Sequence, residues 1–212
     1  MAHTAIPIDE LNVFRSLPDV KVVFDVGARD DVDYLIIKPK IKLHAFEPNP
    51  LFYAQLVDNV GKRKGVYLNN FGLGDIEGTF EYIDGHQAIG VPAKTGVMVK
   101  RLDAYVKKYK IKRIDFLKID TEGYELRVLR GAGSEKDGYE LLKMCRYIQH
   151  EGGVDNIELN SILQRNGFAC YYTGYRNYLC VGNGQPIPWI PEETKEGELV
   201  EKDKSNYLHE SN

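Results

Sequence analysis

The chain of 212 residues is 43% hydrophobic and 28% charged, and its formal net charge is -3 at pH 7. These values are typical of an ordinary globular protein with one sizeable core, and they give no electrostatic basis for broad binding to nucleic acid or to an anionic membrane. No run approaches the roughly 18 apolar residues of a membrane span, and we expect no signal peptide at the N-terminus. We therefore expect a cytoplasmic protein whose partners include neither a membrane nor a nucleic acid.

In the first half of the chain, apolar runs alternate with helix signals. Residues 9–17 predict a short leading helix, and Asn49 is the expected N-cap of a helix with Pro50 at its first position. A glycine-bearing loop that contains His86 is expected at 84–90. Buried strands are predicted from the apolar patterns at 20–26, 41–46, 65–73, 79–83 and 97–102.

The second half continues this alternation and ends in a hairpin pattern. Gly131 is expected to end a helix over 124–129 in the left-handed conformation, and Asp155 and Glu158 have the spacing of a capping box for a helix that runs to Gly167. Another helix is predicted over 102–109, and strands are predicted over 114–119, 147–150, 168–173 and 178–181.

This order of elements predicts an α/β protein. Alternating strands and helices that end in a hairpin indicate a Rossmann-like, doubly wound, mostly parallel sheet with a C-terminal antiparallel hairpin. We expect a helical lead at 1–19, one domain at 20–190 and a charged, weakly ordered tail at 191–212.

The three cysteines are an odd number without close spacing. They form neither a zinc pattern nor an obvious disulfide framework. Cys170 and Cys180 lie in apolar runs, where a small buried side chain is the usual role, and Cys145 is the third. This pattern is typical of a protein from a reducing compartment.

A cluster of basic residues precedes the strand pattern at 114–119. Because it follows an amphipathic helix pattern, we interpret it as a solvated helix end rather than a phosphate-binding patch. Its members are Lys107, Lys108, Lys110, Lys112 and Arg113.

Carboxylates follow the first two strand patterns in an arrangement typical of nucleoside-binding sheets. Asp25 and Gly27 would form the turn beneath a cofactor, and Glu47 follows Gly27 by about the twenty residues that separate a loop glycine from a ribose-binding acid. The turn holds one glycine and two acids, Asp30 and Asp31, which would repel a pyrophosphate. A cofactor without phosphate suits this loop, and S-adenosylmethionine is such a cofactor.

Neighbouring residues complete the predicted cofactor site. Gly74 and Asp75 follow the third strand pattern, where this type of fold contacts adenine, although the same run is equally suited to a plain turn. The other predicted cofactor-binding residues are Ala28, Arg29, Pro48 and Asn49.

A second group of polar residues follows the fourth and fifth strands of the expected parallel sheet. Asp120, Glu122 and His150 are candidate general bases that would take the proton of a hydroxyl group. Alternatively, Asp120 and Glu151 would hold Mg or Mn, and the metal ion would acidify the hydroxyl. Glu122 is also placed to cap the following helix, and His150 also fits a core imidazole.

Six sequence blocks appear together in one order. They are FDVGA (24–28), HAFEPNP (44–50), NNFGLGD (69–75), VKRLDAYV (99–106), FLKIDTEGYELRVLRGA (116–132) and IQHEGG (148–153). In these blocks the sequence resembles the FkbM-type methyltransferases, a branch of the class I S-adenosylmethionine-dependent superfamily. The resemblance implies a seven-stranded sheet and methyl transfer, commonly to a hydroxyl oxygen. The first loop departs from the family pattern, because Arg29-Asp30-Asp31 stands where the family usually has asparagine followed soon by a second glycine.

We therefore expect an S-adenosylmethionine-dependent methyltransferase that acts on the hydroxyl of a small molecule or a glycan. An RNA or protein methyltransferase is an alternative, but it would need a basic substrate face that the sequence shows little sign of. A catalytically degenerate binding module with the same fold would account for the altered first loop. A nicotinamide-dependent oxidoreductase is disfavoured by the missing glycines.

Overall fold

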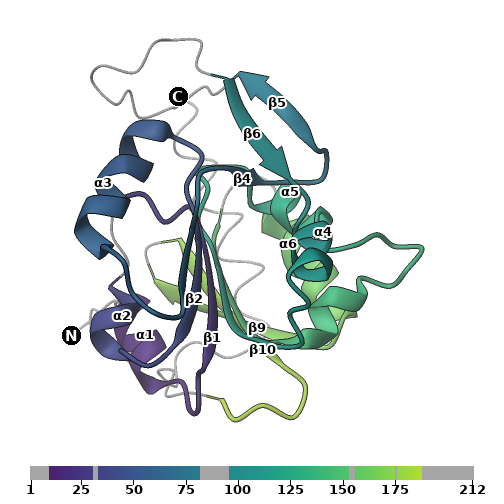
Figure 1. Ribbon diagram of the computed structural model, residues 1–212. Helices are drawn as coiled ribbons and strands as arrows, with labels where there is room; N and C mark the ends of the chain where they lie inside the picture. The colour runs from purple at the N-terminus through teal and green to yellow at the C-terminus, as the bar shows by residue number, and fades with distance from the viewer. Residues whose placement is uncertain (1–9, 31–32, 82–95, 153–155, 175, 188–212) are drawn as a thin grey trace, which may run out of the picture.

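The computed structural model describes residues 10–30, 33–81, 96–152, 156–174 and 176–187 (Figure 1). Several predicted features lie wholly or partly outside these ranges. They are residues 1–9 of the helical lead, Asp31 of the first turn, residues 82–83 of the strand predicted at 79–83, the loop at 84–90 with His86, Asp155 of the capping box and the tail at 191–212.

A seven-stranded sheet forms the centre of the described fold. Its strands are β1 (Val22–Val26), β2 (Lys42–Phe46), β3 (Val66–Asn69), β7 (Ile114–Ile119), β8 (Cys145–Glu151), β9 (Phe168–Gly174) and β10 (Asn177–Gly182). They lie in the order β3-β2-β1-β7-β8-β10-β9. The first five strands in this order, β3, β2, β1, β7 and β8, run parallel. Strand β10 runs antiparallel to its two neighbours, β8 and β9. This confirms the predicted mostly parallel sheet with a C-terminal hairpin.

Helices cover both faces of this sheet (Figure 1). Successive side chains of a strand point to opposite faces, so Val23 packs in one hydrophobic cluster and Phe24 in the other. The longest described helix has 11 residues, and none of the described helices is long and apolar enough to cross a bilayer. One face carries α1 (Glu10–Ser16), α2 (Tyr34–Ile37) and α3 (Pro50–Val60), and the other carries α4 (Leu102–Lys108), α5 (Glu125–Arg130) and α6 (Asn156–Arg165).

The predicted strand at 65–73 is wrong in its extent, because the chain leaves the main sheet after β3. Residues Gly72–Leu73 form β4, which joins β5 (Gly78–Glu81) and β6 (Gly96–Lys100) in a second sheet of order β4-β6-β5. The Asn70 side-chain amide donates to the carbonyl oxygen of Glu47 (2.9 Å), so the turn between β3 and β4 is tied to the end of β2. An apolar pattern carries no information about which sheet each half of it joins.

The predicted left-handed role of Gly131 is also wrong. Gly131 has a φ of −70°, in the right-handed region. A Cβ atom at this position would lie 2.2 Å from the carbonyl oxygen of Gly74, so the absence of a side chain serves a close approach between α5 and the loop after β4.

The cysteine prediction is wrong as well, because Cys170 and Cys180 form a disulfide bond. The register of β9 and β10 places these two residues directly opposite each other, on the same face of the hairpin. The separation of ten residues between the two cysteines does not indicate a disulfide bond, because their pairing depends on the register of the two strands. Cys145 is a buried free thiol.

Replacing Cys170 and Cys180 together by alanine should lower the free energy of unfolding by about 3 kcal/mol, because the bond closes a loop of about ten residues in the unfolded chain. Urea unfolding followed by circular dichroism measures this difference, and a thiol reductant should largely remove it. In denatured, unreduced protein, thiol titration should detect Cys145 alone; three reactive thiols per chain would contradict the bond.

Candidate functional site

The strand order reverses between β1 and β7. From β1 the chain builds outward through β2 and β3, and it then returns to place β7 on the other side of β1. Open parallel sheets bind ligands at the carboxyl ends of their strands where the order reverses, because the loops diverge there and leave a crevice. The residues that follow β1, β2, β7 and β8 therefore meet along one edge of the sheet.

Gly27 allows the loops after β1 and β7 to touch. Its φ is +89°, and its amide, like that of Ala28, donates to the carbonyl oxygen of Phe46 (3.0 and 3.1 Å). A Cβ atom on Gly27 would lie 1.7 Å from the carbonyl oxygen of Asp120, where the two atoms would overlap. Backbone packing therefore requires glycine here, in addition to any role of the turn toward a cofactor.

The Glu47 carboxylate is buried at the end of β2, with 4% of the residue exposed. Oε2 accepts a hydrogen bond from the amide of Arg29 (2.9 Å), and Oε1 accepts one from the amide of Asn49 (2.7 Å). The structure places Glu47 beside the first loop, and its contact with a ribose diol stays a prediction.

Arg29 and Asn49 hold the two loops on either side of Glu47. Arg29 has a φ of +55°, and its guanidinium carbon lies 5.0 Å from the centre of the Phe52 ring. Asn49 is fully buried, and its Oδ1 accepts from the amide of Leu51 (2.9 Å), which confirms the predicted N-cap of α3. The packing of both residues supports the position of the Glu47 carboxylate.

Gly74 and Asp75 lie in the loop that packs on the end of α5. The Gly74 carbonyl lies against Gly131, and Oδ1 of Asp75 is 3.8 Å from Nη1 of Arg127. The Asp75 carbonyl oxygen accepts from Nη1 of Arg101 (2.7 Å). These contacts give the turn a structural role, and its contact with adenine stays a prediction. Gly72, just before this loop, packs against the side chain of Pro48 at the end of β2.

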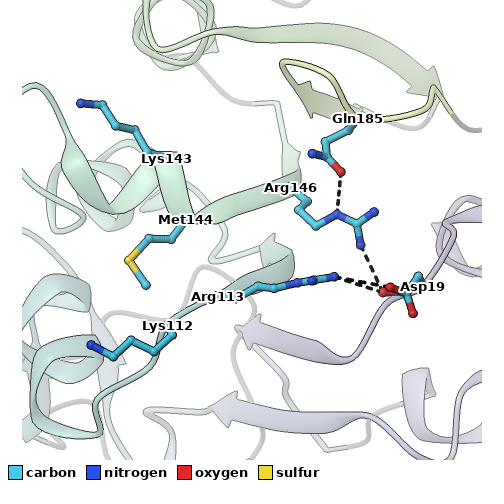
Figure 2. A pocket seen from close by; sticks show the side chains of 7 residues that line it. All are labelled: Asp19, Lys112, Arg113, Lys143, Met144, Arg146 and Gln185. Atoms are coloured by element: carbon cyan, nitrogen blue, oxygen red, sulfur yellow. Dashed lines mark hydrogen bonds and ion pairs between the residues drawn. The ribbon is translucent and has the colours of Figure 1, made fainter.

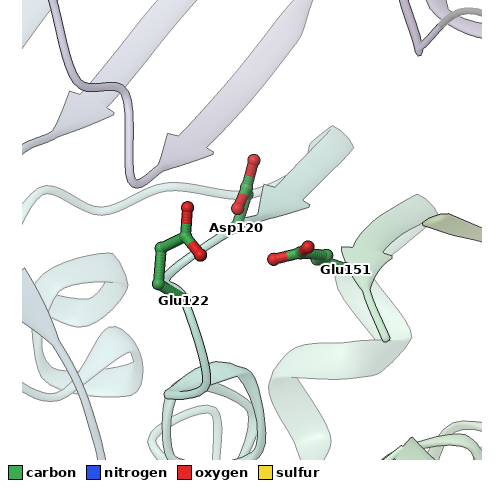
Figure 3. Close-up of side chains that lie close together, drawn as sticks. All are labelled: Asp120, Glu122 and Glu151. Atoms are coloured by element: carbon green, nitrogen blue, oxygen red, sulfur yellow. The ribbon is translucent and has the colours of Figure 1, made fainter. Parts of the chain in front are cut away.

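Three carboxylates converge at the ends of β7 and β8 (Figure 3). Asp120, Glu122 and Glu151 each have an oxygen within 4.8 Å of the others, and we call them the acid cluster. Burial raises the pKa of Glu151 to about 6, the nearby Asp120 adds to the shift, and Arg176, at 3.5 Å, opposes it. A carboxyl group with such a pKa can exchange a proton near neutral pH.

Glu125 satisfies the backbone of the loop that carries Glu122. Its buried Oε1 accepts from the amides of Thr121 (2.8 Å) and Gly123 (3.1 Å). Glu122 itself has a φ of +56°, a conformation uncommon for a residue other than glycine. The N-cap of α5 is Tyr124, which makes no side-chain capping bond, and the Glu122 side chain joins the acid cluster.

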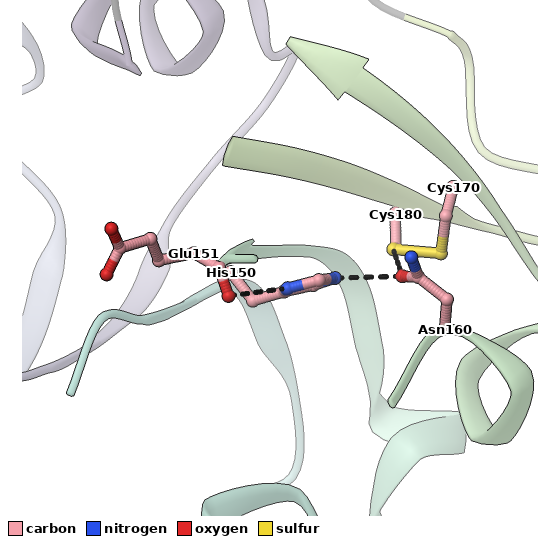
Figure 4. The surroundings of a disulfide bond; sticks show 5 residues. All are labelled: His150, Glu151, Asn160, Cys170 and Cys180. Atoms are coloured by element: carbon pink, nitrogen blue, oxygen red, sulfur yellow. Dashed lines mark hydrogen bonds between the residues drawn. A yellow bond between two sulfur atoms is a disulfide. The ribbon is translucent and has the colours of Figure 1, made fainter. Parts of the chain in front are cut away.

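His150 lies apart from the acid cluster. It precedes Glu151 in β8, and the two side chains point to opposite sides of the strand (Figure 4). The His150 ring is buried, with Nε2 2.9 Å from Oδ1 of Asn160 and Nδ1 3.1 Å from the Glu151 carbonyl oxygen. It stacks on Tyr178 with ring centres 5.2 Å apart, and burial lowers the pKa of His150. These contacts are those of a core imidazole.

A largely buried lysine, which the motif analysis did not single out, lies among the site's acids. Nζ of Lys118 is 3.3 Å from Asp120, 3.6 Å from Glu10 and 3.9 Å from Asp25. Burial by itself lowers the pKa of Lys118, but these carboxylates outweigh it, so its pKa lies above the ordinary value. The sequence feature that indicates this role is the position of Lys118 inside the apolar run at 114–119, since a buried charge needs a partner.

A doubly wound sheet with a buried acid after β2 and an acid cluster after β7 and β8 is the architecture of an enzyme that uses a nucleoside cofactor. The Methyltransferase FkbM domain matches residues 25–170, which is more than half of the chain. The chain therefore belongs to the FkbM methyltransferase family, and this domain is of the S-adenosylmethionine-dependent class.

Three relatives carry methyltransferase names. The chain is 24% identical to the hexuronic acid methyltransferase AglP of Haloferax volcanii over 149 residues, which cover 67% of this chain and 61% of AglP. It is 24% identical to the 2-O-methyltransferase NoeI of Sinorhizobium fredii over 178 residues, or 68% and 70% of the two chains. It is 26% identical to the methyltransferase sdnD of Sordaria araneosa over 197 residues, or 72% and 75%. The match thus spans less than two thirds of the length of AglP.

Replacing Lys118 by methionine should lower the free energy of unfolding by about 3–5 kcal/mol at pH 7, because Asp25, Asp120 and Glu10 would lose the cation they share. Without that cation, like charges are left close together in a largely buried site. Urea unfolding at pH 7 measures the difference. The matched variant Lys107→Met, on the exposed side of α4, should change stability by less than about 0.5 kcal/mol. A deficit for Lys118→Met no larger than that for Lys107→Met would contradict the electrostatic explanation.

Proposed function

We propose that this protein transfers a methyl group from S-adenosylmethionine to a hydroxyl oxygen of a small molecule or a glycan. The observation that carries the proposal is the placement of Glu47 and the acid cluster along the carboxyl ends of four neighbouring strands, in the order β2-β1-β7-β8. A diol-binding acid on one side and proton-accepting acids on the other suit a nucleoside donor that faces a hydroxyl acceptor. AglP and NoeI, named a hexuronic acid methyltransferase and a 2-O-methyltransferase, support an acceptor of this kind.

In this proposal the cofactor lies across the ends of β1 and β2. The turn from Asp25 through Gly27 and Ala28 to Arg29 would face the methionyl arm. Glu47 accepts hydrogen bonds from the ribose hydroxyls, flanked by Pro48 and Asn49. Gly74 and Asp75 lie toward the adenine.

The acid cluster would then serve the acceptor. S-adenosylmethionine would supply an electrophilic methyl group and leave as S-adenosylhomocysteine, and the proton of the methylated hydroxyl would pass to a carboxylate of the cluster. We assign this proton to Glu151, because a pKa of about 6 leaves it ionised at neutral pH and basic for a carboxylate. Asp120 and Glu122 would orient the acceptor, and His150 would support β8 from the opposite face.

Replacing Glu47 by glutamine should weaken S-adenosylmethionine binding about 100-fold, because two hydrogen bonds to a charged acceptor contribute roughly 3 kcal/mol or more. Isothermal titration calorimetry measures the affinity, and circular dichroism confirms that the variant folds. Asp58→Asn removes an exposed acid from α3 and should leave the affinity unchanged. Equal affinities for wild type and Glu47→Gln would remove the basis of the proposed cofactor site.

The methylation rate should rise with pH and level off above an apparent pKa of about 6, because protonated Glu151 cannot accept the hydroxyl proton. Glu151→Gln should lower kcat by at least about 100-fold and abolish the rising limb, with the affinity for S-adenosylmethionine retained. The measurement is S-adenosylhomocysteine formation across pH with a panel of uronic-acid oligosaccharides. A rising limb that persists in Glu151→Gln would assign the base to another group.

The acid cluster has a second proposed role, which is to bind a divalent cation. Asp120, Glu122 and Glu151 would supply oxygen ligands of the kind that Mg and Mn prefer, and the metal ion would acidify the acceptor hydroxyl. Dialysis against EDTA, followed by assays with and without added Mn, separates the two roles. Turnover that ignores both treatments leaves the cluster as a proton acceptor alone.

A catalytically degenerate binding module remains the alternative from another functional class. The Arg29 amide bonded to Glu47 shows that the altered first loop still packs on this carboxylate. A binding module would keep the Glu47-dependent affinity for S-adenosylmethionine and form no S-adenosylhomocysteine with any acceptor, RNA and protein included. The carbohydrate acceptor and the cytoplasmic location stay predictions.

A further inference from the structure

A pocket of about 430 Å³ lies at the opposite edge of the sheet, at the amino ends of β7 and β8 (Figure 2). Its lining includes Lys112 and Arg113, which precede β7, and Lys143 and Arg146, from the 3₁₀ helix η1 (Glu140–Met144) and from β8. The tertiary structure thus brings Lys143 and Arg146 beside Lys112 and Arg113, the last two residues of the basic cluster in the sequence. Since β7 has six residues at about 3.3 Å each, this pocket lies about 20 Å from the acid cluster.

The two arginines of the pocket are held in place by a buried acid. Asp115 is fully buried, and its Oδ2 accepts from the amides of Lys21 and Val22 (2.9 Å each). Its Oδ1 pairs with Nε of Arg113 and lies 3.3 Å from Nη1 of Arg146. Two guanidinium groups are therefore fixed side by side, with one buried carboxylate between them.

The charges around the pocket do not cancel. Four cationic side chains line the pocket, and Lys21 pairs with Asp19 at its rim. They face three carboxylates, those of Asp19, Asp115 and Glu140, which leaves a surplus of two positive charges. Asp19 is 60% exposed and also pairs with Lys21 (3.1 Å), so it neutralises the arginines weakly. Lys143 pairs with Glu140 only at the exposed surface, where an ion pair contributes little.

The arginines and the lysines lie on opposite sides of the pocket. Figure 2 shows the guanidinium groups of Arg113 and Arg146 pointing toward Asp19, while the ammonium groups of Lys112 and Lys143 extend away from them, one on each side of Met144. The arginines are fixed planar donors, and part of their capacity is already used. Arg146 donates to Gln185 and to the carbonyl oxygens of Pro18 and Asp19, and Arg113 donates to Asp115 and to the Asp19 carbonyl oxygen. The lysines are exposed, flexible point charges that can turn toward a bound anion. Two separated cationic groups suit an anion with two charged centres.

We propose that this pocket binds the diphosphate group of a small molecule. A diphosphate carries enough charge to match the surplus, and it has oxygens for the fixed arginine pair and for a lysine that turns toward it. A single carboxylate would reach one group alone. The site is separate from the proposed methyl-transfer site, so each can be tested without the other.

Calorimetric titration with pyrophosphate, at constant ionic strength, tests this proposal on the full chain. Lys112→Ala/Lys143→Ala should weaken pyrophosphate binding about tenfold, because two exposed charge contacts are lost, and should bring it near the affinity for inorganic phosphate. Lys62→Ala/Lys64→Ala removes two exposed lysines between α3 and β3 and is the matched control. The arginines are unsuitable for this test, because their loss would leave Asp115 buried and unpaired.

The expected result is a loss confined to Lys112→Ala/Lys143→Ala, with S-adenosylmethionine affinity unchanged. Glu47→Gln should in turn keep the pyrophosphate affinity. A failure of the proposed cofactor site can therefore be distinguished from a failure of the proposed diphosphate pocket. Equal losses in the two lysine pairs, or no pyrophosphate binding by wild type, would overturn the proposal. Co-sedimentation with vesicles of phosphatidylcholine and phosphatidic acid, with and without competing pyrophosphate, shows whether the same phosphoryl chemistry is also met on a lipid headgroup.

Discussion

The close contact between Gly27 and the backbone of Asp120 determines the geometry of the whole sheet edge. Gly27 donates to Phe46 in β2, while the Asp120 amide donates to Val26 in β1 (3.0 Å each). Three parallel strands are thus joined just beyond their carboxyl ends, where a side chain at Gly27 would force two of them apart. Because Glu47 follows β2 and the acid cluster follows β7 and β8, their relative positions depend on this contact.

Strand β7 carries buried charges of opposite sign at its two ends. Asp115 pairs with Arg113 and Arg146 near the amino end, and Lys118 lies among acids near the carboxyl end. Buried ion pairs contribute little net stability because desolvation offsets the attraction, but removal of one partner is costly. Each charge therefore holds one edge of the sheet in a single arrangement, with a basic pocket at one edge and the acid cluster at the other.

The alternation of side chains along β8 places two neighbouring residues in different environments at a single strand end. His150 packs into the α6 face against Asn160 and Tyr178, whereas Glu151 joins the acid cluster on the other side (Figures 3 and 4). Neighbours in sequence thus belong to different environments, and the burial that lowers the pKa of one raises the pKa of the other because their charged forms have opposite signs.

The sequence by itself determined the sheet, its terminal hairpin, the Asn49 cap and the strand-end positions of Asp25, Glu47 and Asp120, because apolar periodicity and capping are local properties of the chain. Only the tertiary structure decided what depends on register and on long-range approach. It placed Cys170 opposite Cys180 and brought Gly131 against the Gly74 carbonyl oxygen. It also directed the His150 side chain away from that of Glu151 and placed the Lys118 ammonium among carboxylates. These features depend on which elements lie side by side and on which face of a strand a side chain lies. The spacing of the residues along the chain indicates neither.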